Sequence, residues 1–269
     1  MATTREEVMQ QSLTVPTAQQ YENFVQAHGI PSVRQDTPDG GSALWFGSPS
    51  AKRVIAHVPS GGLMMYVTPF YMALAYNVYK AAVSKDKDVA VVVLSYDTCP
   101  SGVYPVQLRQ LVASIVHLMR ERDAKNIDLY GDSVGAILIL AILHHITHPH
   151  PKVPLLSIPS GDCFGRLLFL SPAAPIVTPA LQRSKNIGRD LVGVDDIAQM
   201  WNIIEIISGG CELFHEDIVT LSQVIKAKHH NWVDIYVDET ATHIAFVKEG
   251  LTNSPPSEYT GRVIEWAKG

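Results

Sequence analysis

The stretch NIDLYGDSVGAILIL, residues 126–140, decides the fold of this chain. An apolar run ends in a turn with two glycines and a serine, and an apolar, helix-favouring segment follows. The spacing of Gly131, Ser133 and Gly135 fits a strained strand–turn–helix corner, in which small residues let the two backbones approach closely. Ser133 is then expected at the amino end of a helix, where backbone N–H groups favour developing negative charge. We predict that Ser133 is a nucleophile; a ligand-binding turn or a plain helix cap is the alternative.

Strand-like segments recur on both sides of this corner. Five more runs are short, β-branched and nearly all apolar, as expected of strands that are covered on both faces. They are RVIAHV (53–58), VAVVVLSY (89–96), RLLFLS (166–171), WNIIEIIS (201–208) and WVDIYV (232–237). Helices are expected at residues 69–84, 105–122, 133–145, 215–229 and 256–268. Strands separated by single helices predict an α/β architecture, with a mostly parallel central sheet and helices on both faces.

The rest of the chain is less regular, and we predict that residues 1–269 form a single domain. Residues 1–42 are mixed and polar, with one expected helix at 17–28 and a turn at PDGG. We expect this N-terminal extension to contribute to a cap. Residues 172–200 carry three prolines and weak periodicity, and they are the candidate for a short cap insertion over the carboxyl edge of the sheet.

Composition argues against several classes of partner and cofactor. The formal net charge is −5 and the pI about 6.1, without a cluster of Lys or Arg, so no nucleic-acid partner is expected. No stretch is long and apolar enough to span a membrane, and the first residues lack the apolar region of a secretory signal. The three cysteines are too few and too scattered for a disulfide framework or a zinc site. We therefore expect a cytoplasmic protein with no metal and no other cofactor.

A nucleophilic serine needs an acid and a histidine, which follow it along the chain in this architecture. His243, in VDETATHIAF, lies in a loop just after the last expected strand. Loops at the carboxyl edge of a parallel sheet are where ligands and chemistry gather. Other histidines lie in or beyond the helix after the corner, or at a helix end: His144, His145, His148, His150, His229 and His230. We predict that His243 is the base.

Six segments occur in the order found in a known family: HVPSGGLMM, SYDTCPSGVYP, GDSVGA, LSPAAP, SGGCELFHEDI and THIAF. From about residue 43 onwards the chain resembles the hormone-sensitive-lipase-like α/β-hydrolases, and most of all their fungal branch. The resemblance implies an α/β-hydrolase fold with eight strands, a small cap, and ester cleavage through an acyl-serine. It implies that Ser133 is the nucleophile and that His243 is the catalytic histidine. It assigns the oxyanion donors to the backbone N–H groups of Gly61, Gly62 and Val134.

The chain departs from this family in two places. The family's oxyanion loop is a histidine followed directly by glycines, whereas here Val58, Pro59 and Ser60 stand between His57 and the glycines, and Pro59 has no N–H to donate. We expect a reshaped oxyanion loop.

The second departure concerns the acid, because Cys211 stands where the family has an aspartate. A thiol cannot stabilise an imidazolium as a carboxylate does. Either Glu212 supplies the carboxylate or the triad is weakened; Asp238 and Glu239 are fallback acids. Asp132, beside the nucleophile, either hydrogen-bonds the oxyanion or caps loops.

The segment GGLMMYVTPFYM, residues 61–72, is rich in methionine and aromatic residues beside the expected oxyanion loop. Met64 and Tyr66 are candidate substrate contacts, and the partner expected is a hydrophobic small-molecule ester or lactone of secondary metabolism. A redirected enzyme for cyclisation, isomerisation, epoxide opening or C–C cleavage is one alternative, and a non-catalytic ligand-binding protein is another. A homodimer is the oligomer considered.

Overall fold

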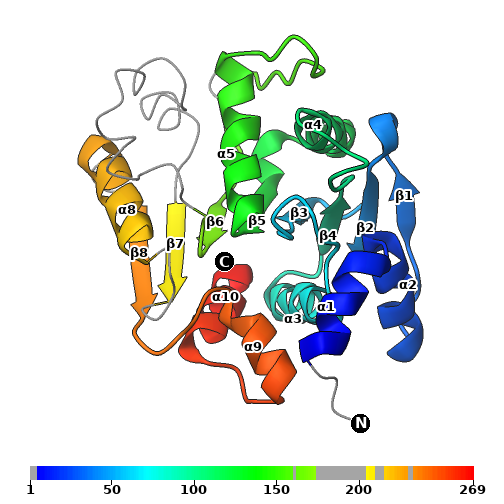
Figure 1. Ribbon diagram of the computed structural model, residues 1–269. Coiled ribbons are helices and arrows are strands. Elements are labelled where there is room, and N and C mark those ends of the chain that lie inside the picture. The colour runs from blue at the N-terminus through cyan, green and yellow to red at the C-terminus, as the bar shows by residue number, and fades with distance from the viewer. Residues whose placement is uncertain (1–4, 160–161, 174–203, 210–214, 230–232) are drawn as a thin grey trace.

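The computed structural model describes residues 5–159, 162–173, 204–209, 215–229 and 233–269, which surround one central sheet (Figure 1). The sheet has eight strands in the order β1-β2-β4-β3-β5-β6-β7-β8. The strands are β1 (Arg34–Asp36), β2 (Ser42–Phe46), β3 (Arg53–Val58), β4 (Val89–Ser95), β5 (Ile127–Asp132), β6 (Leu167–Leu170), β7 (Ile204–Gly209) and β8 (Val233–Asp238). Only β2 runs antiparallel to its neighbours β1 and β4, and the pairs from β4 to β8 are parallel. The predicted mostly parallel sheet of about eight strands is confirmed.

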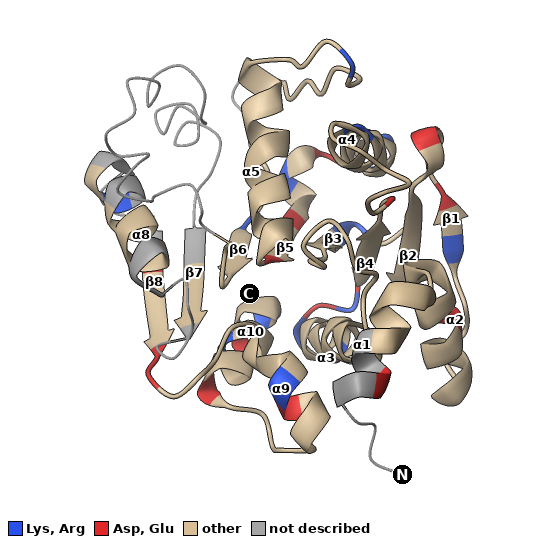
Figure 2. Ribbon diagram, in the orientation of Figure 1, with Lys and Arg blue, Asp and Glu red and all other residues tan. Residues whose placement is uncertain are grey.

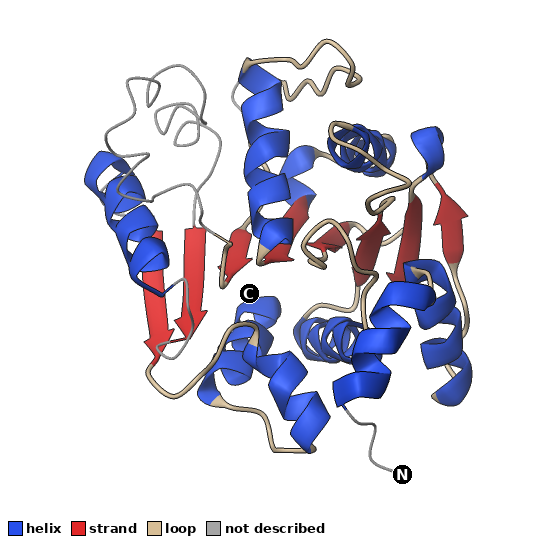
Figure 3. Cartoon of the chain, in the orientation of Figure 1, coloured by secondary structure: helices blue, strands red, loops and turns tan. Residues whose placement is uncertain are grey.

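Helices cover both faces of this sheet (Figures 1 and 3). One face carries α4 (Val106–Met119), α5 (Val134–Thr147) and α8 (His215–His229). The other carries α2 (Thr17–Ala27), α3 (Pro69–Lys85), α9 (Ala245–Thr252) and α10 (Glu258–Lys268). The predicted layers are therefore present.

The central helix α5 is almost entirely apolar, and the central strand β5 is buried although it carries Asp128 and Asp132, whose carboxylates are paired with Arg53 and His57. All six residues of β5 are buried, and α5 has no Lys, Arg, Asp or Glu along its length (Figure 2). Such a strand and helix can only lie in the middle of the molecule, where both can be covered. The corner between them is thereby fixed at the centre of the sheet's carboxyl edge.

Two strands and two helices of the structure, β1, β2, α1 (Arg5–Thr14) and α9, were not predicted from the sequence. The strand β1 is three polar residues long, and β2 follows a loop with two glycines, so neither gives a clear period-two pattern. The helix α1 has a polar sequence, and α9 is only eight residues long. Residues 34–36 belong to the sheet and α2 packs on it through Tyr21, Phe24 and Val25. The cap assigned to residues 1–42 and 172–200 stays a prediction, and residues 174–203 lie outside the described part of the chain.

Candidate active site

Ser133 occupies the corner between β5 and α5 in a strained backbone conformation. Its φ of 48° and ψ of −119° lie where residues other than glycine are rarely found. Its backbone N–H donates to the carbonyl of Leu170 on β6 at 2.8 Å, which holds the corner to the neighbouring strand. Strain of this kind persists only where the surrounding structure fixes it, and it is frequent at functional sites.

The two glycines of the pentapeptide have a direct steric role. A Cβ on Gly131 would lie 2.7 Å from the carbonyl carbon of Gly135, and one on Gly135 would lie 2.1 Å from the carbonyl oxygen of Val58. Real Cβ atoms essentially never come so close. The glycines therefore let α5 start directly against β5 and against the end of β3, as the sequence spacing predicts.

The structure brings Ser133 and His243 together from positions far apart in the chain. The Nε2 atom of His243 lies 3.0 Å from the Oγ atom of Ser133, within hydrogen-bond distance. His243 lies in the loop between β8 and α9, at the same edge of the sheet as the end of β5. A base within this distance of a serine hydroxyl can accept its proton.

The glycine loop after β3 folds into a tight turn beside this pair. Three consecutive residues, Gly61, Gly62 and Leu63, have positive φ values of 124°, 59° and 63°. The N–H groups of Met64 and Met65 both donate to the carbonyl of Gly61, at 3.0 and 2.8 Å. A side chain at Gly61 would collide with the carbonyl of Met65, so this turn depends on that glycine.

Three hydrogen bonds from different parts of the chain fix the glycine loop. The Tyr96 hydroxyl donates to the carbonyl of Pro59 at 2.7 Å. The Cys99 N–H donates to Leu63 at 2.6 Å, and the Tyr66 N–H donates to the carbonyl of Ser12 in α1 at 2.7 Å. Tyr96, Cys99 and Ser12 were not assigned to the site from sequence. The bonds of Cys99 and Ser12 join backbone atoms only, so the residue types at these positions do not reveal them in the sequence.

Strand register places the glycine loop next to the corner. Val58, at the end of β3, pairs with Gly131 on β5, so residues 59–62 emerge beside the segment 132–134. Gly61, Gly62 and Val134 are thus close to Ser133 in the fold. Their N–H groups as oxyanion donors stay a prediction.

Asp132 makes a buried pair with His57 of the neighbouring strand. Its Oδ1 lies 3.0 Å from the His57 Nε2, and both side chains are fully buried. The His57 ring stacks on Tyr130, with centroids 4.2 Å apart, and lies near Tyr71. Burial, with the charge of Asp132 as the next cause, raises the pKa of Tyr71 well above its ordinary value. Of the two roles considered for Asp132, this contact favours support of the loops around the nucleophile.

The acid position is not described by the structure, since Cys211 and Glu212 lie within residues 210–214. The fallback acid Asp238 is described, and its carboxylate is bound elsewhere. Its Oδ1 accepts hydrogen bonds from Thr240 and Ala241, and its Oδ2 accepts one from the Tyr259 N–H. Oδ1 thus holds the loop that carries His243, and Oδ2 ties Asp238 to α10.

The two predicted substrate contacts lie on the glycine loop. The Met64 side chain is 67% exposed, which is unusual for a large apolar residue, and Tyr66 is half-buried. The Met65 sulfur accepts a hydrogen bond from the Ser12 hydroxyl at 3.6 Å. Met64 and Tyr66 therefore belong to a turn that hydrogen bonds hold in place, and contact with a substrate stays a prediction.

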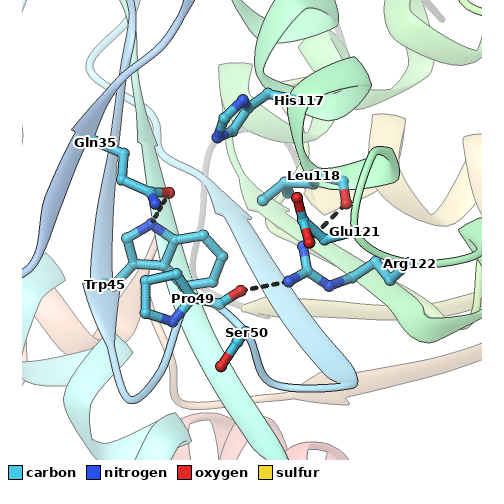
Figure 4. Close-up of a pocket in the computed structure, with 8 residues that line it drawn as sticks. All are labelled: Gln35, Trp45, Pro49, Ser50, His117, Leu118, Glu121 and Arg122. Atoms are coloured by element: carbon cyan, nitrogen blue, oxygen red, sulfur yellow. Dashed lines mark hydrogen bonds between the residues drawn. The ribbon is translucent and has the colours of Figure 1, made fainter.

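A cleft of about 220 Å³ lies at the opposite edge of the sheet, where the chain enters β3 (Figure 4). The indole N–H of Trp45 donates to Gln35 Oε1 at 3.1 Å. The Arg122 guanidinium donates to the carbonyls of Pro49 and Leu118. These polar groups join the β2–β3 loop to the end of α4, which is a structural task remote from Ser133.

Within the described ranges, the helices are all too short or too polar to cross a bilayer. The same part of the chain shows no group of three His, Cys, Asp or Glu side chains that could hold a metal ion.

Comparisons with known proteins agree with this arrangement. A family model described as steryl acetyl hydrolase matches residues 42–159, less than half of the chain. Carboxyl esterase 2 from the mycorrhizal fungus Tuber melanosporum superposes with a TM-score of 0.64 at 16% identity, over 94% of this chain and 97% of that one. An esterase from the bacterial hormone-sensitive lipase family gives 0.64 at 18% identity, over 93% and 90%. Esterase LipW from Mycobacterium marinum gives 0.63 at 15% identity, over 99% and 89%.

These comparisons establish the fold of the chain as that of the α/β-hydrolases and show that it is similar to carboxylic-ester hydrolases. A comparison with curated protein sequences gives no match. Esterases from a fungus and from bacteria superpose about equally well, so the predicted fungal branch is not singled out.

Proposed function

We propose that this protein is a serine-dependent carboxylic-ester hydrolase. The observation that carries the proposal is the 3.0 Å contact between Ser133 Oγ and His243 Nε2, made at a strained corner at the centre of the sheet. A ligand-binding turn or a helix cap needs no histidine at the hydroxyl. This contact also favours chemistry over a non-catalytic binding role.

The proposed reaction runs through an acyl-serine. Ser133 Oγ attacks the ester carbonyl carbon while His243 takes the hydroxyl proton, and the carbonyl oxygen becomes an oxyanion. The N–H groups of Gly61, Gly62 and Val134 stabilise this charge. The tetrahedral intermediate expels the alcohol, which receives the proton from His243. Water then attacks the acyl-serine by the same route and releases the carboxylic acid.

The proposed substrate is a hydrophobic small-molecule ester or lactone with a bulky alcohol part, made in secondary metabolism. Exposed Met64 and half-buried Tyr66 beside the nucleophile support an apolar substrate. A matching family is described as steryl acetyl hydrolase, so acetyl esters of polycyclic alcohols are the first compounds to test.

Labelling with a fluorophosphonate tests the proposal, together with hydrolysis of p-nitrophenyl acetate. We expect one label per chain on Ser133 and none in Ser133→Ala. His243→Ala should lose a factor of about 10³ or more in kcat/KM. A loss below tenfold would remove His243 from the mechanism.

Ser114→Ala is the matched control. Ser114 is also buried, but it lies within α4, and its hydroxyl donates to the carbonyl of Gln110 at 2.8 Å. This variant should be labelled and turn over like the wild type. Turnover by Ser133→Ala at the wild-type rate would refute covalent catalysis.

A further inference from the structure

The loop that carries His243 contains a strained residue directly after the histidine. Ile244 adopts the left-handed conformation, with φ 45° and ψ 62°, and begins α9. For a β-branched side chain this conformation is a genuine outlier and is unfavourable. The loop therefore needs contacts from outside itself to keep this shape, and with it the direction of His243.

The first such contact is made by Asp238, which precedes the loop. The Asp238 side chain is buried, and its Oδ1 accepts the N–H of Thr240 at 3.0 Å, the hydroxyl of Thr240 at 2.8 Å and the N–H of Ala241 at 3.1 Å. Its Oδ2 accepts the N–H of Tyr259 in the first turn of α10 at 3.1 Å. One carboxylate thus ties the start of the loop to a helix that is distant in sequence.

The second contact comes from Glu249, which follows the loop in α9. Its carboxylate accepts the N–H of Ser257 at 3.0 Å and the Ser257 hydroxyl. It also accepts the Thr260 hydroxyl at 2.8 Å. Glu249 therefore ties the helix after His243 to the same turn of α10.

The first turn of α10 is a suitable anchor for both carboxylates. Its first N–H groups have no carbonyl partner within the helix, and they favour negative charge together with the positive end of the helix dipole. The turn is itself fixed to the sheet, because the Tyr259 hydroxyl is bonded to Ser171 at 2.9 Å and Tyr259 is fully buried.

Apolar packing joins the loop to this anchor only in part. Ala241, Ala245 and Tyr259 belong to one apolar cluster, but a cleft of about 180 Å³ is lined by residues of both segments, among them Thr240, Ala245, Ser254 and Ser257. The hydrogen bonds of the two carboxylates span this region where apolar contact is incomplete.

We propose that Asp238 and Glu249 are positioning residues, which hold His243 against Ser133. Asp238 precedes the histidine loop and Glu249 follows it in α9, and both bind the first turn of α10. This inference rests on the proposed function for its effect on turnover. Asp238→Asn replaces one acceptor oxygen by an amide NH₂ group, which cannot accept a hydrogen bond from an N–H. Glu249→Gln does the same on the other side of the loop.

A double-mutant cycle on the His243 ring signal tests the positioning without any substrate. In the wild-type background, Ser133→Ala should shift the His243 ring proton resonance, because the two side chains are in contact. In the Asp238→Asn or Glu249→Gln background, the same serine substitution should shift it by less than half as much. An equal shift in all backgrounds would overturn the proposal.

Turnover of p-nitrophenyl acetate provides the second readout. Asp238→Asn should lower kcat by about tenfold to a hundredfold, as expected for a displaced catalytic group, with KM changed less than twofold. Asp128→Asn is the matched control: this buried carboxylate pairs with Arg53 and Arg166 at the opposite edge of the sheet. Its loss should lower the melting temperature and leave kcat unchanged.

The outcomes separate the two proposals. If the wild type shows the Ser133–His243 coupling but hydrolyses no ester, the proposed function fails and the positioning stands. If the wild type turns over and both carboxamide variants keep full kcat and full coupling, the positioning fails alone. Should Asp238→Asn not fold, Glu249→Gln decides the question by the same two measurements.

Discussion

Asp132, the residue before the proposed nucleophile Ser133, is hydrogen-bonded to His57 at 3.0 Å with both side chains fully buried. The pair links the end of β3, where the glycine loop begins, to the corner that presents Ser133.

The first prediction concerns this pair. Replacing His57 by Phe keeps a ring next to Tyr130 but leaves the Asp132 carboxylate buried without its partner. We expect a loss of about 3–5 kcal/mol in the free energy of unfolding, measured by urea denaturation. Adding Asp132→Asn should restore part of it, since the unpaired charge is then gone. If the double variant is as unstable as the sum of the two single variants, the residues are not coupled.

The second prediction compares two neighbouring glycines. A Cβ on Gly61 would lie 2.1 Å from the Met65 carbonyl oxygen, whereas one on Gly62 meets nothing within 4 Å. Both residues have positive φ, but the 59° of Gly62 lies in the left-handed region that alanine can enter at a modest cost, whereas the 124° of Gly61 is nearly restricted to glycine. Gly61→Ala therefore carries both the larger backbone cost and the collision. Gly61→Ala should reduce kcat by about a hundredfold by displacing the oxyanion loop, and Gly62→Ala by less than tenfold. Equal defects in ester hydrolysis would show that the turn closed on Gly61 is not what matters.

The third prediction addresses the acid. If Glu212 orients His243, Glu212→Gln should lower ester hydrolysis strongly, by up to about 10⁴-fold, because a neutral amide cannot stabilise imidazolium. Cys211→Ala should then cost little. If the triad is weakened, which we favour, Glu212→Gln should be silent and Cys211→Asp should raise hydrolysis of a p-nitrophenyl ester. A large Glu212→Gln defect without any gain from Cys211→Asp would decide against a weakened triad.

The fourth prediction is a pH dependence set by Asp238. Burial by itself would raise its pKa, but hydrogen bonds from Thr240, Tyr259 and Ala241 together outweigh this and lower the pKa below the ordinary 3.8. A carboxyl group whose pKa is lower in the folded state stabilises that state above its unfolded pKa, and the contribution is lost as the pH falls through the folded value. The loop should therefore be intact at neutral pH and loosen below about pH 4.

Thermal unfolding between pH 2.5 and 6 measures this effect. The difference in melting temperature between wild type and Asp238→Asn should be constant above about pH 5 and shrink as the solution is made more acidic. A difference that stays constant to the lowest pH would mean that the Asp238 carboxylate does not contribute through its charge.

Much of the fold could be predicted from local sequence. The segments 53–58 and 215–229 match β3 and α8 in both bounds, because a strand rich in β-branched residues and a helix with acidic residues in its first turn leave strong signals. The strands β1 and β2 could not be found, since three polar residues and a five-residue run gain their order from pairing with strands elsewhere in the chain. The start of helix α9 is fixed by the loop before it, and a search for the helical period of apolar residues does not detect such a short helix.

The site was accessible from sequence only in part. Ser133 and His243 could be placed together because the pentapeptide and the position after the last strand each have a known geometry. The supports could not, because Asp238, Glu249 and Tyr96 act through backbone groups of distant residues. Such bonds form only in the folded chain, and no fixed spacing of residue types in the sequence predicts them.

The bond from the Tyr66 N–H to the carbonyl of Ser12 connects the N-terminal helix α1 to the glycine loop that we propose as the oxyanion site. Because the acceptor is a main-chain oxygen, no side-chain exchange at Ser12 removes it, and only displacement of the whole helix does. Shortening the chain at its amino end should thus loosen the glycine loop step by step and leave the contact between Ser133 and His243 in place.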